Sequence, residues 1–253
     1  MLFLVGPAAH VSHAEVIKLG TWNESALARM ISAVQQFDNP GEVIVALSDH
    51  FKGSPYAENS LHGGPDQPEE LVINLSEFDC FTFLDVVEAL RRSSRYEDFS
   101  DNLKAVRYFD ATVAYEKRRH FFSDWLIGNT PIEDVTLMIG KGRTLSVNKH
   151  LNLKPDASLW LAGIGVTARQ IHYLPAEKVD EDILSALRPG DYVGVFSPLE
   201  GLDVSHTGII VKDKGRTLLR HASSRRETGR VVDEALLPYL KDKPGLVVYR
   251  VKP

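Results

Sequence analysis

Apolar residues recur at helical spacing in two stretches of the N-terminal part of the chain. The first stretch predicts an amphipathic helix over residues 21–37, which the turn signal at 39–41 ends. The second predicts a core-facing helix that opens just before Cys80, because Ser76 followed three residues later by Asp79 is a capping pattern. The apolar positions are Trp22, Ala26, Met30, Ala33 and Phe37 in the first stretch, and Phe83, Leu84, Val87 and Leu90 in the second.

The last third of the chain shows a different period. Short β-branched or alternating runs, separated by turn signals, are typical of strands, and the turn at 213–215 joins two of them as a hairpin. Helices followed by a small antiparallel sheet give an α+β fold. The predicted strands are 191–196, 204–211, 217–221 and 246–251, with a brief helical or irregular segment at 236–240.

Two connecting stretches are less regular. The run 42–47 fits either a short strand or another turn of helix. Residues 49–70 are rich in glycine and proline, and so long a loop inside a domain is usually functional or disordered. Because this loop leads toward Cys80, we expect it to frame the functional site.

Composition narrows the classes of function. The 253 residues carry a formal net charge of −5, which provides no basic footprint for nucleic acid or an anionic membrane. No apolar run approaches the roughly 18 residues of a membrane-spanning helix. Cys80 is the only cysteine, which excludes an internal disulfide and any multi-cysteine metal site. We expect no metal and no other cofactor.

The N-terminal residues resemble the end of a secretory signal. An apolar run at 2–5 is followed by small residues and by Ser12-His13-Ala14, although no basic segment precedes it. We therefore expect residues 1–19 to be a signal remnant or a flexible N-terminus, and the protein to be periplasmic or otherwise exported. The functional domain is expected to be a single unit over 20–253.

Residues 163–168 formally match the dinucleotide-binding pattern GxGxxA. That pattern should open a long helix inside a βαβ unit, with an acidic residue about 20 residues further on. Tyr173-Leu-Pro175 leaves no room for such a helix. We therefore expect no dinucleotide cofactor.

Cys80 is the first candidate for chemistry. In the first turn of a helix, unpaired backbone N–H groups and the positive end of the helix dipole favour the thiolate, which is the reactive form. Asp79 opposes this by raising the pKa of the thiol, unless its carboxylate points outward. The alternative is a buried structural cysteine, since cysteine is among the most buried residue types.

His206 and His221 are the second candidate. If Asp213 and Lys214 form the hairpin loop, the two histidines lie directly opposite each other on adjacent strands, about 5 Å apart at Cβ. A slip of one residue would put them on opposite faces of the sheet. Gly208, on the same face as His206, leaves room for another backbone or a ligand. The alternative is a pair of polar histidines packed on a half-buried sheet.

Together Cys80, His206 and His221 are the residue types that an activated thiol nucleophile requires. His206 would take the proton of Cys80, and His221 would hold the other ring nitrogen of His206. The order Cys…His…His matches the papain-like arrangement, in which a helix and a sheet face each other across a cleft.

The stretch 118–126 is a candidate for substrate binding. It combines Arg119, Asp124 and Trp125 with other basic and aromatic residues, as clefts for sugars or peptides do. The alternative is an aromatic cluster that closes the end of a helix.

The chain resembles the NlpC-type cysteine peptidases that cut bacterial peptidoglycan. The resemblance rests on motifs in the same order: Gly53-Ser-Pro-Tyr56, Phe78-Asp-Cys80, Pro189-Gly-Asp191, Ser205-His-Thr-Gly208 and His221-Ala222. It implies a papain-like core and catalytic roles for Tyr56, Cys80, His206 and His221. The chain departs from the common pattern in the long gap between Tyr56 and Cys80, and in Phe-Thr-Phe after Cys80.

These departures resemble one branch, the N-acetylmuramoyl-L-alanine amidase-like family. Its pattern is similar to Asp79-Cys80-Phe-Thr-Phe83, His120-Phe-Phe-Ser-Asp-Trp125, Tyr173-Leu-Pro175, Gly201-Leu-Asp-Val-Ser-His206 and His221-Ala-Ser-Ser224. The resemblance implies cleavage of the amide between N-acetylmuramic acid and L-alanine in peptidoglycan fragments, anhydro-muropeptides in particular. It also implies that residues 100–180 form an insertion that shapes the substrate site for a sugar.

Three other functions fit parts of the pattern. A γ-D-glutamyl-diaminopimelate endopeptidase would belong to the same superfamily. A metal hydrolase would use His206, His221 and a carboxylate such as Asp203. A non-catalytic glycan-binding module would need Cys80 only as a core residue.

Overall fold

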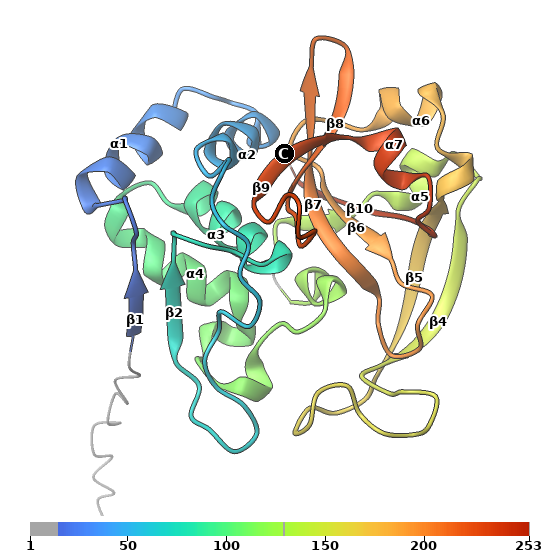
Figure 1. The fold of residues 1–253 in the computed structure, drawn as a ribbon, viewed down its shortest axis with the longest axis horizontal. Helices are drawn as coiled ribbons and strands as arrows, with labels where there is room; N and C mark the ends of the chain where they lie inside the picture. The colour runs from blue at the N-terminus through green and yellow to red at the C-terminus, as the bar shows by residue number, and fades with distance from the viewer. Residues whose placement is uncertain (1–14, 129, 253) are drawn as a thin grey trace, which may run out of the picture.

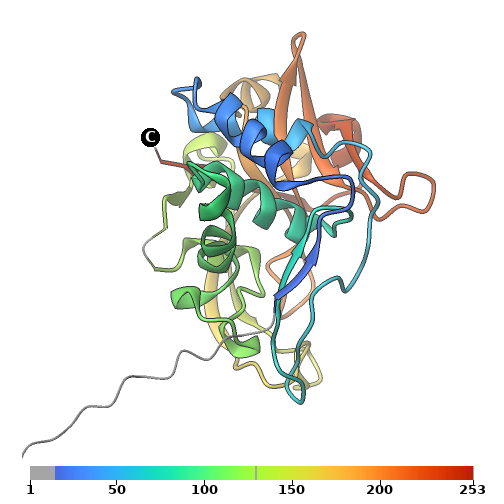
Figure 2. The same cartoon turned by 90° about the vertical axis from the view of Figure 1, so that its left-hand side faces the viewer.

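The computed structural model describes residues 15–128 and 130–252. These residues form a helical part and a sheet part, which lie side by side (Figure 1). Figure 2 turns the helices toward the viewer, with the strands of the large sheet behind them. The main helices are α1 (Glu24–Val34), α2 (Pro40–Asp49), α3 (Cys80–Arg92) and α4 (Phe99–Arg107). The short helices α5 (Thr136–Gly140), α6 (Glu181–Ala186) and α7 (Leu236–Leu240) lie in the sheet part.

The large sheet has eight strands, in the order β4-β5-β10-β6-β7-β8-β9, with β3 also paired to β10. All of these pairings are antiparallel. The strands are β3 (Ile132–Asp134), β4 (Leu145–Leu151), β5 (Thr167–Pro175), β6 (Tyr192–Phe196), β7 (Val204–Asp213), β8 (Arg216–Ala222), β9 (Val231–Ala235) and β10 (Gly245–Val251). A separate parallel pair joins β1 (Glu15–Lys18) to β2 (Leu71–Asn74).

The sheet is larger than the small sheet expected from the last third of the chain. The strands β3, β4 and β5 come from residues 100–180, which the family resemblance assigned to an insertion. Their sequences are rich in polar residues, and β4 and β5 expose many of them, so the apolar alternation that signals a half-buried strand is weak there. The mixed fold of helices and an antiparallel sheet is otherwise as predicted.

The helix boundaries follow their caps. Asn39 accepts a hydrogen bond from the backbone N–H of Gly41 and begins α2, with Pro40 in the first turn. The run 42–47 is therefore helical. Asp79, rather than Ser76, caps α3: its carboxylate accepts from Phe81 and Thr82, and Thr82 accepts from the N–H of Asp79.

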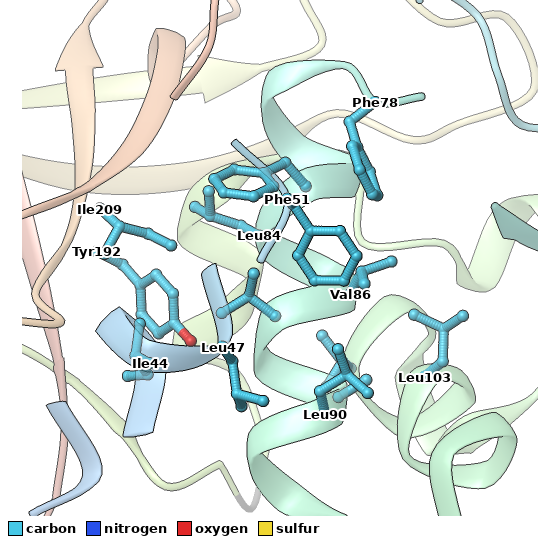
Figure 3. Packing of buried hydrophobic residues seen from close by; sticks show 14 of the residues in the cluster. Ile44, Leu47, Phe51, Phe78, Leu84, Val86, Leu90, Leu103, Tyr192 and Ile209 are labelled. Atoms are coloured by element: carbon cyan, nitrogen blue, oxygen red, sulfur yellow. The ribbon is translucent and has the colours of Figure 1, made fainter. Parts of the chain in front are cut away.

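Two apolar clusters cover the two faces of the sheet. Neighbouring residues of one strand point to opposite faces, so Ile209 belongs to the cluster under the helices and Ile210 to the cluster under α5–α7. Figure 3 shows the first cluster, to which Leu84 of α3 and Tyr192 of β6 both belong. This packing places the start of α3 beside the central strands.

A buried arginine joins α2 to the sheet next to the predicted site. Arg220, in β8, is 2% exposed and forms ion pairs with Asp49 of α2 and Asp233 of β9. It also donates to the hydroxyl of Ser48. A buried charge with several partners holds its strand in place, because losing one partner leaves the charge uncompensated.

The structure bears on the predictions for the N-terminal segment and for residues 163–168. Residues 1–14 of the expected N-terminal segment lie outside the described residues, whereas Glu15–Lys18 form β1 and pair with β2. Residues 163–168 run through a loop into β5, so no helix follows the GxGxxA pattern. Within the described part of the chain, no helix has both the length and the apolar character needed to cross a bilayer.

Candidate active site

Cys80 is the first residue of α3, directly after the Asp79 cap. The first four N–H groups of a helix have no partner inside the helix. Asp79 accepts those of Phe81 and Thr82, while the N–H of Cys80 donates to no oxygen atom among the described residues. Cys80 as a whole residue is intermediate between buried and exposed. The sulfur and a free N–H donor are thus presented together at the end of a well-capped helix.

A hydrogen bond from Thr207 ties the start of α3 to β7. The hydroxyl of Thr207 donates to the backbone carbonyl of Cys80 at 2.7 Å. Thr207 follows His206 directly in β7, so this bond places the start of α3 next to the backbone of His206. Cys80 and His206 both line one pocket of about 300 Å³. No hydrogen bond joins their side chains among the described residues, as is common before a substrate binds.

His206 and His221 are in contact, although their register differs from the prediction. The hairpin loop is Lys214 and Gly215, so β7 and β8 pair Ile209 with Arg220. Continuing that register places Gly208 opposite His221, and the two histidines are diagonal neighbours. The error is two residues, so both side chains stay on one face. Their rings are joined by a hydrogen bond of 2.7 Å between Nε2 of His206 and Nδ1 of His221.

Gly208 provides the space for this diagonal contact. A Cβ at position 208 would lie 3.1 Å from the Cβ of His221 and 2.8 Å from the carbonyl oxygen of Arg220. The space beside Gly208, which was predicted to hold another backbone or a ligand, is therefore filled by β8. The missing side chain at position 208 allows the ring of His221 to approach that of His206.

A carboxylate continues the chain beyond the two histidines. The other ring nitrogen of His221, Nε2, is 3.0 Å from Oε1 of Glu234 in β9. Arg225 donates to the second oxygen of the same carboxylate at 2.8 Å. Tyr239 of α7 packs against both imidazoles. Sequence reasoning missed Glu234, because β9 was not predicted and nothing in its local pattern marks one acidic residue above another.

The protonation of the site is governed by burial. Burial, followed by the charge of Asp79, raises the pKa of Cys80 to about 11, and hydrogen bonding from Thr207 opposes this only in part. Burial, followed by the nearby charges of His221, Lys243 and Arg225, lowers the pKa of His206 to about 3. These shifts favour a neutral thiol and a neutral imidazole near neutral pH. The carboxylate of Asp79 is turned to the helix rather than outward, which is why it disfavours the thiolate.

Tyr56 lies beside the start of α3. Its backbone forms a parallel bridge with Phe78, two residues before Cys80, and its N–H donates to the carbonyl of Gly229. Burial, followed by the charge of Cys80, raises the pKa of Tyr56 to about 12. The loop 49–70 thus brings Tyr56 close enough for the charge of Cys80 to affect its phenol, and a catalytic role for Tyr56 stays a prediction.

The three predicted substrate-binding residues do not line the pocket at Cys80. Trp125 is buried among Phe81, Phe122 and Tyr192. The carboxylate of Asp124 accepts from the N–H of Phe121 and pairs with Arg169, and Arg119 donates to backbone carbonyls of Asp124 and Ile127. The same stretch lines the pocket through other side chains instead, namely His120, Phe121 and Phe122.

A loop that the sequence did not single out forms another wall of the pocket. Trp160 is 40% exposed, and its indole N–H donates to the carbonyl of Glu200 at 2.9 Å. Lys154 lies over its ring at 4.9 Å. Leu161 and Leu202 line the pocket beside it. The only sequence feature that could have predicted this wall of the pocket is a tryptophan in a loop that contains glycine.

The carboxylate of Asp203 accepts hydrogen bonds from the backbone. It accepts from the N–H groups of Ser123 and Val204, at 2.7 and 2.8 Å. Among residues 15–128 and 130–252, no three His, Cys, Asp or Glu side chains gather as metal ligands would. The two histidines therefore have the Glu234 carboxylate, and not Asp203, as their acidic partner.

A family model described as AmiA-like, N-acetylmuramoyl-L-alanine amidase-like, matches residues 46–246. Among curated proteins no match was found.

Two solved structures are similar over most of the chain. A Legionella pneumophila protein has a TM-score of 0.76 at 21% identity, with 91% of this chain and 94% of that chain covered. An N-acetylmuramoyl-L-alanine amidase from Bacteroides uniformis has a TM-score of 0.69 at 27% identity, covering 85% of this chain and 99% of its own. The first likeness bears on the fold alone. The second gives a named enzyme with the same architecture.

Proposed function

The chain belongs to the AmiA-like, N-acetylmuramoyl-L-alanine amidase-like family, and we propose that it hydrolyses the amide between N-acetylmuramic acid and L-alanine in peptidoglycan fragments. The proposal includes a preference for anhydro-muropeptides. The observation that carries it is that Cys80 and His206 line one pocket, with His206 hydrogen-bonded to His221. The Bacteroides uniformis structure, itself named as this amidase, supports the choice of bond.

In the proposed mechanism, the sulfur of Cys80 attacks the carbonyl carbon of the amide while His206 takes the thiol proton. Because the resting pair is neutral, the proton moves as the S–C bond forms, and His206 acts as a general base. The C–N bond then breaks, and His206 returns the proton to the departing nitrogen of alanine. Water hydrolyses the thioester, which releases the muramic acid carboxylate and regenerates the thiol.

The oxyanion formed during attack needs donors close to Cys80. The N–H of Cys80 is free for this role and lies at the positive end of α3. We assign a second donor to the hydroxyl of Tyr56, which its raised pKa keeps protonated. One such donor contributes about 3–4 kcal/mol where it has been measured.

The surroundings of the pair suggest how the substrate lies. The pocket is lined mainly by apolar and aromatic side chains, and Trp160 offers a partly exposed ring at its wall. Aromatic faces of this kind cover the apolar face of a sugar ring. On the other side of His206, the cations Arg225 and Lys243 lie over Tyr239. We therefore place the sugar in the pocket and the stem peptide, with its carboxylates, toward Tyr239.

The test is mass spectrometry of defined muropeptides after incubation with the protein. The expected products are the free stem peptide and the sugar with a free lactyl carboxylate. The variant Cys80→Ala should form neither while its thermal unfolding matches the wild type, and Cys80→Ser serves as a matched control of similar size. Full activity of the alanine variant would contradict the thiol mechanism.

The product masses also separate this proposal from its alternatives. Cleavage after γ-D-glutamate would give a disaccharide that still carries a dipeptide, and would identify an endopeptidase. Binding of the muropeptide without turnover would identify a glycan-binding module. Inhibition by a chelator but not by a thiol reagent would point to a metal hydrolase.

We also propose that the protein acts outside the cytoplasm, where peptidoglycan lies. This rests on the signal-like character of the first residues of the chain. Fractionation of cells that express the full-length chain with its native start tests the proposal. Recovery of the protein only with cytoplasmic markers would contradict it.

A further inference from the structure

Four side chains form a continuous hydrogen-bonded chain away from the pocket. Nε2 of His206 meets Nδ1 of His221 at 2.7 Å, and Nε2 of His221 meets Oε1 of Glu234 at 3.0 Å. Oε2 of Glu234 accepts from Nη1 of Arg225 at 2.8 Å. His221 is 1% exposed, so it has little access to water as an alternative partner.

The proton positions along this chain follow from the two members farthest from the pocket, Arg225 and Glu234. An arginine only donates hydrogen bonds, and an ionised carboxylate only accepts them. Nε2 of His221 must therefore carry a hydrogen to bond Glu234. Burial lowers the pKa of both histidines, so each neutral ring carries one hydrogen near neutral pH. Nδ1 of His221 is then an acceptor, and the hydrogen of His206 must be on Nε2.

We propose that Glu234 is a positioning residue that sets the tautomer of His206 through His221, leaving Nδ1 of His206 as the unprotonated nitrogen at the pocket. The inference rests on the proposed function, in which that nitrogen takes the proton of the Cys80 thiol. Without Glu234, His221 is free to carry its hydrogen on Nδ1. It would then donate to Nε2 of His206, and Nδ1 of His206 would be protonated and unable to act as a base.

Arg225 makes this proposal testable, because it restricts what a replacement amide can do. In Glu234→Gln, one terminal atom is an oxygen and the other an NH2 group. Arg225 has only donors, so the oxygen turns to Arg225 and the NH2 turns to His221. Nε2 of His221 must then accept, and both histidine tautomers are inverted. In the double variant with Arg225→Met, the amide is free to rotate, its oxygen can face His221, and the native tautomers return.

Nitrogen-15 NMR of the histidine rings reads these tautomers directly, in protein labelled at histidine. The wild type should show hydrogen on Nε2 of both His206 and His221, assigned from the single variants His206→Gln and His221→Gln. Glu234→Gln should show hydrogen on Nδ1 of both rings, and the double variant should restore the wild-type pattern. The single variant Arg225→Met should keep the native tautomers.

The rate of Cys80 alkylation by iodoacetamide near pH 7 is the functional readout. It should fall about tenfold or more in Glu234→Gln and recover in the double variant, since loss of a positioned base costs about 10²–10⁴-fold in rate. A merely structural role for Glu234 predicts a further loss in the double variant, since a second native contact is removed.

Two results would overturn the inference. One is an unchanged pair of tautomers in Glu234→Gln, and the other is a double variant that reacts no faster than the single one. If Glu234→Gln fails to fold, the wild-type spectrum decides alone, because hydrogen on Nδ1 of His206 contradicts the proposal. Neither readout uses a muropeptide, so failure of the proposed substrate leaves this test intact.

Discussion

The two sides of His206 differ in polarity. On one side lies the pocket shared with Cys80, whose walls include Phe81, Phe122 and Trp160. On the other side lies a charged cluster, in which Arg225 and Lys243 stack over Tyr239. Both sides meet at a pair of neutral groups, the thiol of Cys80 and the imidazole of His206.

This difference in polarity suggests how the site would recognise an amide that joins a sugar to a peptide. An apolar pocket favours an uncharged ring and penalises a buried carboxylate that finds no cation. The cations beside Tyr239 would attract a peptide that carries carboxylates. The sides would then select the sugar and the peptide separately, so replacing a residue on either side should raise KM, and only the loss of a cation should depend on the length of the stem peptide.

The largest effect should come from the residue where the two sides meet. His206→Gln removes the proposed base but keeps a polar side chain of similar reach. We expect the rate of muropeptide cleavage to fall by about 10²–10⁴-fold, with little change in KM. Steady-state kinetics measure this, with thermal unfolding as the control for folding. Activity within about threefold of the wild type would remove His206 from the mechanism.

A smaller effect should come from the apolar side. Trp160→Ala removes the exposed ring of the pocket wall, and we expect KM to rise about fivefold at nearly constant kcat, which corresponds to about 1 kcal/mol of stacking. Trp160→Phe keeps an aromatic face and should lose less. Equal kinetics for alanine and tryptophan at this position would show that the sugar does not contact this wall.

The charged side should contribute less still, because its cations are partly exposed. Lys243 pairs with no carboxylate among the described residues. Lys243→Met should raise KM for fragments with a full stem peptide by about two- to fivefold, and added salt should reduce the difference. The exposed Lys214→Met, at the tip of the β7–β8 hairpin, is the matched control. A fragment that carries only alanine should bind both variants equally.

The finest test concerns the neutral pair itself. Since burial and the charge of Asp79 raise the pKa of Cys80 to about 11, no thiolate should form at neutral pH, and its ultraviolet absorbance should appear only in strong alkali. The absorbance difference between wild type and Cys80→Ala measures this. Asp79→Asn keeps an N-cap residue and removes the charge, so the midpoint should move to lower pH. A thiolate at neutral pH would replace general-base attack by a preformed ion pair.

Local patterns predicted the parts of the site that depend on near neighbours. The helical spacing from Phe83 to Leu90 placed Cys80 at the start of a helix, although the cap proved to be Asp79 and not Ser76. The strands with strong alternation, 204–211 and 217–221, were also predicted. Their register was two residues out, and the histidines stayed on one face only because side chains alternate with a period of two.

Other parts depended on groups far apart in the sequence. The stretch 118–126 has the composition of a binding site, but its fold turns Trp125 inward and leaves Phe121 and Phe122 at the pocket. Glu234 acquires its place beside His221 only because β9 pairs with β8. Trp160 reaches the pocket because its indole bonds the carbonyl of Glu200, 40 residues away.

The sequence by itself determined that a lone cysteine opens a buried helix and that two histidines share a β-hairpin, since capping, helical period and strand alternation act between residues a few positions apart. The tertiary structure alone decided which side chains meet around them: Thr207 with Cys80, Glu234 with His221, and the ring of Trp160 with the pocket. The physical reason is that sheet order and loop packing depend on contacts between distant segments, whose strength no local pattern records.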